Sequence, residues 1–216
     1  MIHYNISLTG KMRSGKDTVQ EMLIKSIIYQ ITSKHSKHLS YPLVAKLAFG
    51  DAVKKYSREL FPGAYENNNV KQRKLLQSFG QKMREIDEDV WIKILDKELQ
   101  RTVNTPSVFE DVFFKSNLEK VIITFITDVR QPNEFEYAKD LGIVIKVEAD
   151  DKVRKERMSI KGEDVSDELV NHETESHIDS YETDFTVDNN GDTVELRRQL
   201  EPIIQYILED ITSKIN

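Results

Sequence analysis

The stretch LTGKMRSGKDTVQ, residues 8–20, decides the fold prediction because it has the spacing of a phosphate-binding loop, G-x-x-x-x-G-K. Gly10 and Gly15 let the chain turn tightly, so that successive backbone N–H groups and the N-terminus of the following helix point at one anion. Lys16 then lies where it reaches the β- and γ-phosphates of a nucleotide. The stretch therefore predicts a phosphate-binding loop, with a glycine-rich surface turn as the alternative.

The sequence on either side supports this interpretation. An apolar, β-branched run at 4–9 precedes the loop and indicates a strand. Apolar residues at Val19, Leu23, Ile24 and Ile27 follow with helical spacing and indicate a helix over 17–29. The motif thus stands between a strand and a helix, as a phosphate-binding loop requires.

The residue after the lysine departs from the usual motif. Asp17 stands where Ser or Thr commonly contacts Mg²⁺, and a carboxylate there can bind the metal directly or through water. Thr18 is the alternative ligand. Asp17 is also explained as an acid in the first turn of a helix, where the dipole favours negative charge.

The rest of the chain alternates between short apolar runs and longer helical patterns, which predicts an α/β fold with a mostly parallel central sheet and helices on both faces. The unbroken apolar run at 121–126 favours a central position for its strand. We expect strands at 4–9, 43–50, 120–128 and 143–149, and helices at 17–29, 71–86, 89–103, 132–141 and 193–211.

A second part of the site is predicted at the end of the strand at 120–128. Asp128 resembles a Walker B acid, and the carboxyl ends of parallel strands are where open α/β sheets bind ligands. Val129 occupies the place where motor ATPases carry a second carboxylate, which favours transfer over hydrolysis. Arg130 can hold an anionic acceptor through two parallel hydrogen bonds. A local ion pair or turn cap is the alternative for this pair.

Two further arginines are candidates for the transfer step. Arg154 and Arg157 lie three positions apart, hence on one helical face, and a polar segment with Gly162 follows. A mobile cover here would bring positive charge to a transferring phosphoryl group. The alternative is a solvated helix face on which these arginines pair with Glu156 and Asp150.

Composition limits the class of protein. A chain of 216 residues suits one domain, and its net charge of −6 with a pI near 5.5 argues against a nucleic-acid-binding surface. There is no cysteine, so disulfides and thiolate metal sites are excluded. No apolar run approaches the ~20 residues of a membrane helix, and no signal segment is visible, so we expect a cytoplasmic protein.

The segments GKMRSGKDT, RKLLQSFGQKMREIDEDVWIK, ITDVRQPNEFEYAKDLGIVIKVEA and HETESHIDSYETDFTVDNNGDTVEL, in this order, resemble the deoxynucleoside monophosphate kinases of bacteriophages, within the P-loop nucleoside and nucleotide kinases. The resemblance covers most of the chain, except segments 33–41 and 104–117. It implies a three-layer P-loop NTPase fold like that of nucleoside monophosphate kinases, with an acceptor-binding helical region at about 50–117 and a lid at about 154–181. It also implies ATP, Mg²⁺ and, for a phage-encoded protein, the host cytoplasm.

The resemblance also implies roles for residues. It places Arg13 and Lys16 in the phosphate loop, and Arg84, Trp91, Asp128 and Arg130 near the acceptor, although Trp91 is equally explained as a core residue. The residues predicted to act in catalysis are Arg13, Lys16, Arg130, Arg154 and Arg157. Those predicted to bind the nucleotide are Gly10, Lys11, Met12, Arg13, Ser14, Gly15, Lys16, Asp17 and Thr18, and those predicted to bind the metal are Asp17 and Asp128.

The sequence therefore predicts a kinase that transfers the γ-phosphoryl group of ATP to a deoxynucleoside monophosphate, as a monomer or homodimer without nucleic-acid or membrane partners. The accepted base is left open, because it depends on a few pocket contacts. One alternative is a kinase of another phosphorylated acceptor, resembling phosphomevalonate or dephospho-coenzyme A. Another is a nucleotide-binding regulatory or DNA-processing ATPase, for which a second carboxylate after Asp128 is expected.

Overall fold

The computed structural model describes residues 1–34, 38–65, 71–104, 118–162 and 176–215. The chain divides into two compact units, which are described separately. The first unit comprises Met1–Lys46 with Thr105–Asn216, and the second comprises Leu47–Asn104. Most of the segment 104–117 and the middle of the predicted lid, 163–175, lie outside the described residues.

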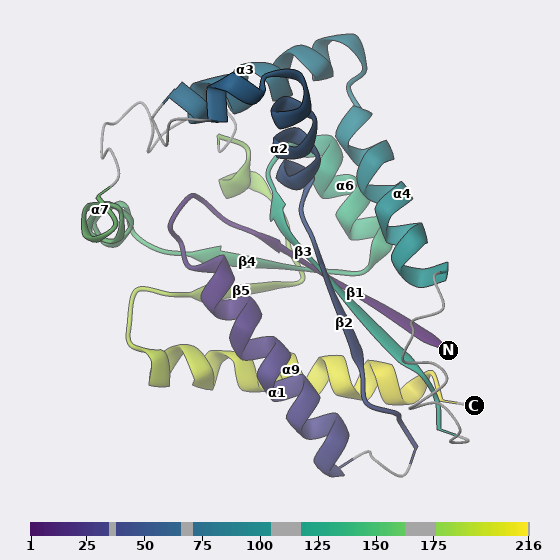
Figure 1. The fold of residues 1–216 in the computed structure, drawn as a ribbon. Helices are drawn as coiled ribbons and strands as arrows, with labels where there is room; N and C mark the ends of the chain where they lie inside the picture. Colours follow the sequence, from purple (N-terminus) through teal and green to yellow (C-terminus); the bar gives the residue numbers. More distant parts are fainter. Residues whose placement is uncertain (35–37, 66–70, 105–117, 163–175, 216) are drawn as a thin grey trace. The chain divides into compact units, whose positions relative to one another are not determined.

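The first unit is built on a five-stranded sheet with the strand order β2-β3-β1-β4-β5 (Figure 1). β1 pairs in parallel with β3 and with β4, and β4 pairs in parallel with β5. The predicted α/β class is thereby confirmed. β3, for which a central position was predicted, lies inside the sheet next to β1, and β1 is the central strand. The strands are β1 (Ile2–Thr9), β2 (Leu43–Leu47), β3 (Val121–Val129), β4 (Ile143–Glu148) and β5 (Phe185–Asp188).

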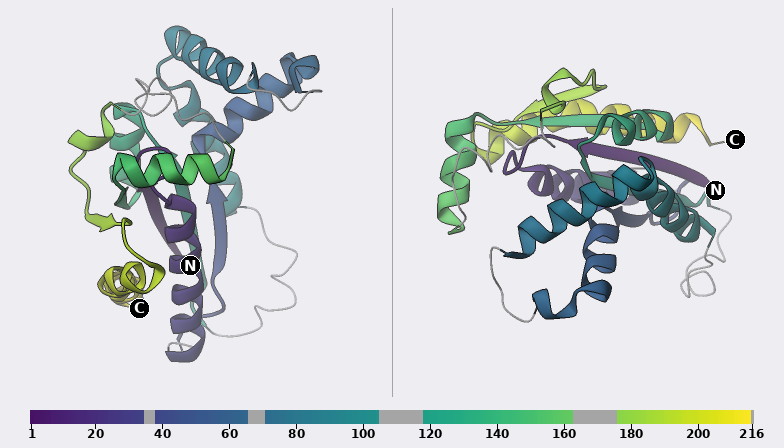
Figure 2. Two further views of the ribbon diagram at one scale, coloured as in Figure 1. Left: turned by 90° about the vertical axis from the view of Figure 1, so that its left-hand side faces the viewer. Right: turned by 90° about the horizontal axis from the view of Figure 1, so that it is seen from above.

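Helices cover both faces of this sheet. α1 (Lys16–Lys34) and α9 (Thr193–Ser213) contact each other and bury one apolar face of the strands. α6 (Pro132–Leu141) contacts β3 and β4 from the other side, with Phe135 and Ala138 buried. Successive strand residues point to opposite faces, so both cores are filled from the same strands. Figures 1 and 2 show this three-layer arrangement, which confirms the prediction of helices on both faces.

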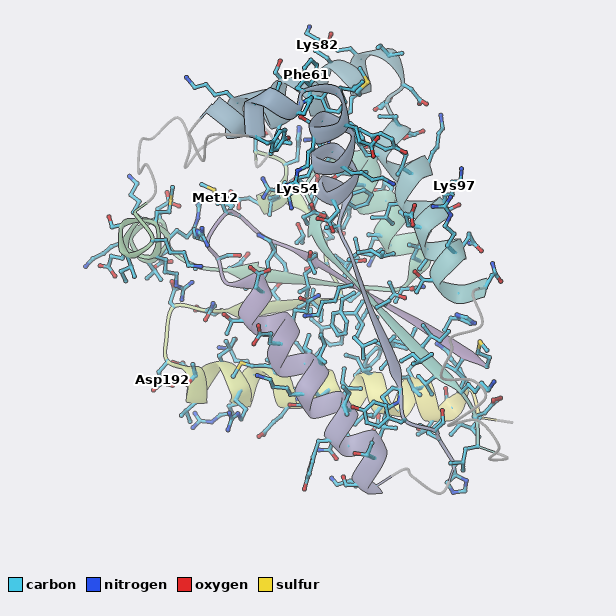
Figure 3. The ribbon with its side chains drawn as sticks, in the orientation of Figure 1. Met12, Lys54, Phe61, Lys82, Lys97 and Asp192 are labelled. Atoms are coloured by element: carbon cyan, nitrogen blue, oxygen red, sulfur yellow. The ribbon has the colours of Figure 1, made fainter. Side chains whose placement is uncertain are left out.

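The start of α9 is fixed by a side-chain cap, and two further helices flank strands β4 and β5. α9 starts after Asp192, which is labelled in Figure 3. The Asp192 carboxylate accepts hydrogen bonds from the backbone N–H groups of Val194 at 2.8 Å and Glu195 at 2.9 Å. Such a side chain satisfies N–H groups that have no partner within the helix. α7 (Asp151–Ile160) follows β4 directly, and the short 3₁₀ helix η3 (Ile178–Ser180) precedes β5.

The second unit is helical and has an apolar core of its own. Val53, Phe79, Trp91 and Leu95 are buried within it, and the rings of Phe79 and Trp91 lie 5.9 Å apart between centroids. Burial of these side chains is the main term that stabilises such a small helical unit. Its elements are α2 (Phe49–Leu60), η1 (Pro62–Tyr65), α3 (Lys71–Ile86) and α4 (Val90–Asn104).

One predicted element has the wrong bounds, and one strand was not predicted. The strand predicted at 43–50 ends at Leu47, and α2 begins at Phe49. The helical spacing of Phe49, Val53 and Ser57, which are all buried, is masked by the charged residues between them. β5 was not predicted, because four residues with only Val187 fully buried give no periodic signal.

The part of the chain that the structure describes contains no helix that is long and apolar enough to cross a bilayer.

Candidate phosphate-binding site

The loop between β1 and α1 has the backbone conformation of an anion-binding nest. Arg13 has a φ of 64°, and Gly10 and Gly15 have φ values of 145° and 101°. Left-handed residues within such a turn bring successive N–H groups to one concave side. A side chain at position 15 is excluded for a second reason, since an added Cβ would lie 2.0 Å from the Nδ2 atom of Asn189.

Every carbonyl oxygen from Gly10 to Gly15 accepts a hydrogen bond. The Lys16 ammonium donates to the Gly10 carbonyl at 2.6 Å and to the Lys11 carbonyl at 3.1 Å. The Gly15 carbonyl accepts the Val19 N–H within α1. The three carbonyls between these ends accept from side chains outside the loop, namely Arg154 for Met12, Arg157 for Arg13, and Arg157 with Asn189 for Ser14.

The direction of these carbonyls sets the direction of the amides. In a trans peptide the C=O group and the next N–H group point in opposite directions, and the described residues contain no cis peptide. The carbonyls of Met12, Arg13 and Ser14 face α7 and the end of β5, so the N–H groups that follow them face the other way. The Ser14 N–H donates to the Lys11 carbonyl, which tightens the turn. The loop can thereby present donors to a phosphate.

The first turn of α1 contributes the remaining predicted nucleotide ligands, Asp17 and Thr18, and Asp17 is also one of the two predicted metal ligands. Asp17 and Thr18 are exposed at its N-terminus. Among the described residues there is no group of three or more His, Cys, Asp or Glu side chains that could hold a metal. Mg²⁺ commonly uses one or two carboxylates together with substrate phosphates and water. Asp17 and Asp128 fit that requirement as a donor set, and their role stays a prediction.

The predicted acceptor loop leaves the sheet beside the phosphate-binding loop. Thr9, the last residue of β1, is paired with Val129, the last residue of β3, and its hydroxyl donates to the Val129 carbonyl at 2.9 Å. Neighbouring strands lie about 4.8 Å apart. Gly10 and Arg130, the next residues on the two strands, therefore begin two adjacent loops. Asp128 is half-buried at the end of β3.

The backbone of Arg130 is fixed on both sides. Its N–H donates to the Glu134 carboxylate at 3.0 Å, and its carbonyl accepts the Tyr181 hydroxyl at 2.8 Å. Glu134 is buried, and the Tyr181 ring stacks on Phe135 at 4.2 Å between centroids. Burial, followed by the charges of Glu134 and Glu136, raises the pKa of the Tyr181 phenol, which keeps the hydroxyl protonated as a donor. Glu134 is the residue that caps this turn.

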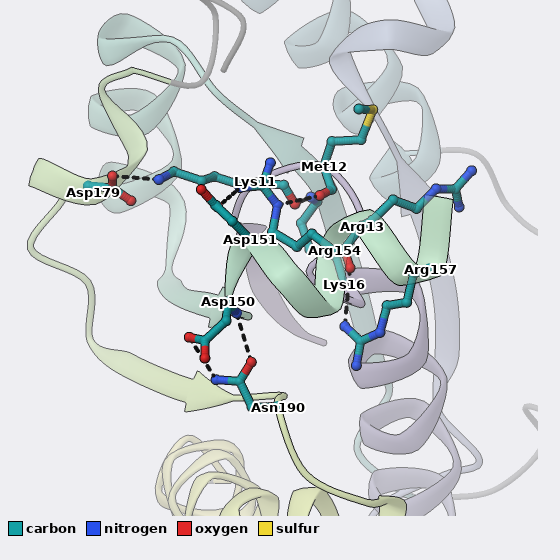
Figure 4. A network of polar contacts seen from close by, with 10 residues as sticks. All are labelled: Lys11, Met12, Arg13, Lys16, Asp150, Asp151, Arg154, Arg157, Asp179 and Asn190. Atoms are coloured by element: carbon teal, nitrogen blue, oxygen red, sulfur yellow. Dashed lines mark hydrogen bonds and ion pairs between the residues drawn. The ribbon is translucent and has the colours of Figure 1, made fainter. Parts of the chain in front are cut away.

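The two arginines predicted to close over the transfer contact the loop backbone (Figure 4). Arg154 is 0% exposed, and its Nε atom donates to the Met12 carbonyl at 2.8 Å while Nη1 pairs with Asp151 at 2.8 Å. Arg157 donates from Nη1 to the carbonyls of Arg13 and Ser14, both at 3.1 Å. Their predicted contact with a phosphoryl group stays a prediction.

Sequence reasoning missed Asn189 as part of the site. Its Nδ2 atom donates to the Ser14 carbonyl at 2.7 Å, and its own carbonyl accepts from Arg157 at 2.8 Å. The segment DNNGD at 188–192 is part of the resemblance to phage kinases, which implies no role for Asn189. Two adjacent asparagines before a glycine were the available signal, although this pattern is typical of turns in general.

The other predicted acceptor residues lie in the second unit. Trp91 is 2% exposed, and its indole N–H donates to the Gly80 carbonyl at 3.1 Å, so it is a core residue of that unit. Arg84 is half-buried in the last turn of α3. A contact of either residue with an acceptor stays a prediction.

The sheet order, the layers and the loop at the end of β1 define the P-loop NTPase fold. Residues 6–177 match the AAA domain family, and the chain belongs to this family. A comparison with curated proteins found no match.

One solved structure supports the fold, and two others are more distantly similar. The crystal structure of TT1252 from Thermus thermophilus is 16% identical with a TM-score of 0.56, over 98% of this chain and 99% of that chain. A gluconokinase from Sinorhizobium meliloti is 12% identical with a TM-score of 0.48, over 99% and 98%. Kti12 from Chaetomium thermophilum, in complex with ADP-AlF3, is 15% identical with a TM-score of 0.46, over 96% and 98%. The similarity to TT1252 shows the fold alone.

Proposed function

We propose that this protein is a kinase that transfers the γ-phosphoryl group of ATP to the phosphate of a deoxynucleoside monophosphate. One observation carries the proposal. A loop whose carbonyls from Gly10 to Gly15 all accept hydrogen bonds begins at the end of β1, beside the loop that carries Arg130 at the paired end of β3. Two anion-binding groups on neighbouring strands suit a reaction between two phosphates.

The first loop would hold the donor. Its amides and the N-terminus of α1 bind the phosphates, and Lys16, now on the carbonyls of Gly10 and Lys11, gains stronger acceptors in the anionic phosphate oxygens. Asp17 or Thr18, with Asp128, would hold Mg²⁺. When bound, this ion neutralises charge on the transferring group.

The second loop would hold the acceptor. Arg130, whose backbone is fixed by Glu134 and Tyr181, binds the acceptor phosphate. No side-chain base is needed, because a monophosphate oxygen is already anionic at neutral pH, so alignment lowers the barrier. Arg154 and Arg157 add positive charge next to the donor loop.

The choice of a deoxynucleoside monophosphate rests on the resemblance of four segments of this chain to phage kinases of that class. Absence of a carboxylate at Val129 supports transfer to an acceptor over hydrolysis. Membership of the AAA domain family is compatible with both reactions, so the acceptor has to be found by experiment.

A coupled assay of ADP release tests the proposal, with ATP, Mg²⁺ and each of the four deoxynucleoside monophosphates in turn. The expected result is turnover with one or two acceptors. Lys16→Ala should abolish it, while Lys25→Ala, an exposed change on the same helix, should not. ADP release that is independent of every acceptor would overturn the kinase assignment. Turnover with only a different phosphorylated compound would overturn the substrate.

A further inference from the structure

The segment that joins β5 to α9 packs against the outer side of the phosphate-binding loop. Asn189 is its first residue and is 6% exposed. Its backbone N–H donates to the Glu148 carbonyl at 2.8 Å, which anchors it to the end of β4. Its side-chain amide donates to the Ser14 carbonyl at 2.7 Å. The end of β5 is thus fixed to β4, and it positions the Asn189 amide as a hydrogen-bond donor to the middle of the loop.

Arg157 closes the same network from α7. Its Nη1 atom donates to the carbonyls of Arg13 and Ser14, and its Nη2 atom donates to the Asn189 carbonyl at 2.8 Å. The Ser14 carbonyl therefore accepts from two side chains, and these side chains are themselves joined. A planar guanidinium can bind several acceptors at once in this way, which an ammonium group cannot.

The fit of Asn189 against the loop is close. A Cβ atom on Gly15 would lie 2.0 Å from Asn189 Nδ2 and 3.6 Å from Arg157 Nη1. Glycine at position 15 therefore allows these two side chains to approach the loop, and it also permits the left-handed backbone conformation there. Ser14, between the left-handed residues Arg13 and Gly15, is fully buried.

We infer that Asn189 and Arg157 are positioning residues, which together hold the Ser14 carbonyl outward and so direct the N–H group of Gly15 toward the donor phosphates. Arg157 also holds the Arg13 carbonyl, and the N–H group that follows it, that of Ser14, donates to the Lys11 carbonyl within the loop. We call these two residues the Asn189–Arg157 pair. Rotation of the Ser14–Gly15 peptide would replace a donor with a carbonyl oxygen in the phosphate site. Holding this peptide in advance lowers the cost of ordering the loop when a nucleotide binds. The inference rests on the proposed nucleotide site, and it assigns the pair to donor binding and not to the acceptor.

The neighbouring Asn190 provides a matched control. Its side chain is bonded to Asp150, by accepting the Asp150 N–H at 2.7 Å and by donating to the Asp150 carboxylate at 3.3 Å (Figure 4). These hydrogen bonds connect the same chain segment to the start of α7 and involve none of the loop carbonyls. A change at Asn190 therefore perturbs the segment but leaves the bond to Ser14 in place.

The test is the dissociation constant of ADP with Mg²⁺, measured by titration calorimetry on the full chain for wild type, Asn189→Asp, Arg157→Lys and Asn190→Ala. Asn189→Asp keeps the size of the side chain and replaces the donor with an oxygen. It should weaken the binding of ADP roughly tenfold or more, because the Ser14 carbonyl loses the closer of its two donors and faces a carboxylate oxygen instead. Arg157→Lys should act in the same direction, and Asn190→Ala should stay within about twofold of wild type. Circular dichroism checks that each variant is folded. If Asn189→Asp does not fold, the affinity of Arg157→Lys for ADP decides the test.

Steady-state kinetics add a readout that a general loss of structure would not give. The KM for ATP should rise with the dissociation constant of ADP, while the KM for the acceptor stays unchanged. If the variants bind ADP more weakly but the wild-type protein has no kinase activity, the positioning role of the pair is supported and the proposed function is refuted. If folded Asn189→Asp and Arg157→Lys proteins bind ADP as tightly as wild type, the positioning role of the pair is wrong, and the kinase proposal is unaffected.

Discussion

Replacement of Arg154 by methionine separates two roles for this arginine. The change removes the hydrogen bond from Nε to the Met12 carbonyl and the ion pair with Asp151, and it keeps most of the aliphatic stem. A hydrogen bond from a charged donor is worth about 1.5–3 kcal/mol. The Asp151 side chain is 58% exposed, so the ion pair adds about 0–1 kcal/mol.

The buried guanidinium also carries a desolvation cost that the substitution relieves. We therefore expect a net loss of about 1–3 kcal/mol in the free energy of unfolding. For a chain of this length, such a loss lowers Tm by roughly 2–12 °C. Lys152→Met, an exposed change on the same helix, should shift the free energy by less than about 0.5 kcal/mol.

Urea denaturation followed by circular dichroism measures the free energy, and the coupled ADP-release assay measures turnover on the same preparations. The contacts of Arg154 predict that stability falls and that nucleotide affinity falls with it. An Arg154→Met protein as stable as Lys152→Met, with normal nucleotide affinity but with kcat reduced by about 10³, would refute this reasoning. That result would instead place the guanidinium on the transferring phosphoryl group.

Three further predictions concern other parts of the chain. Trp91→Phe should lower the free energy of unfolding by about 1–2 kcal/mol in urea denaturation, because the bond to the Gly80 carbonyl is lost; unchanged stability with a raised acceptor KM would show that the indole binds substrate. Tyr181→Phe should raise the acceptor KM about threefold or more and leave the ATP KM unchanged, because it releases the Arg130 carbonyl; equal changes in both constants would contradict this. Backbone N–H groups in the first turn of α9 lower the pKa of Asp192, so its stabilising contribution is present above the usual carboxyl pKa near 4 and is lost as pH falls through the lowered value. Asp192→Asn should therefore match wild type in Tm at pH 3 more closely than at pH 7, and a constant difference in Tm would count against this role.

The parts of the site that could be predicted from the sequence are those whose residues lie close together along the chain. Gly10, Gly15 and Lys16 lie within one short motif, and the strand and helix around it have strong periodicity. β3 was predicted because its apolar run is continuous, and Arg130 could be placed because it directly follows that strand.

The parts that were missed depend on distant contacts. Asn189 meets Ser14 across 175 positions of sequence, and no local pattern distinguishes it from an ordinary turn residue. Arg157 was correctly placed on a helical face, but the identity of its partners depends on where α7 packs. The fold is therefore more readily predicted than the network that supports the loop.

The claim that the loop at the end of β1 binds the phosphates of a nucleotide is tested most directly by titration calorimetry of ATP with Mg²⁺ into wild type and Lys16→Ala. We predict saturable binding of one nucleotide per chain to wild type and affinity at least about tenfold weaker in a folded Lys16→Ala protein. Absence of binding to wild type, or equal affinity in the two proteins, would contradict the claim.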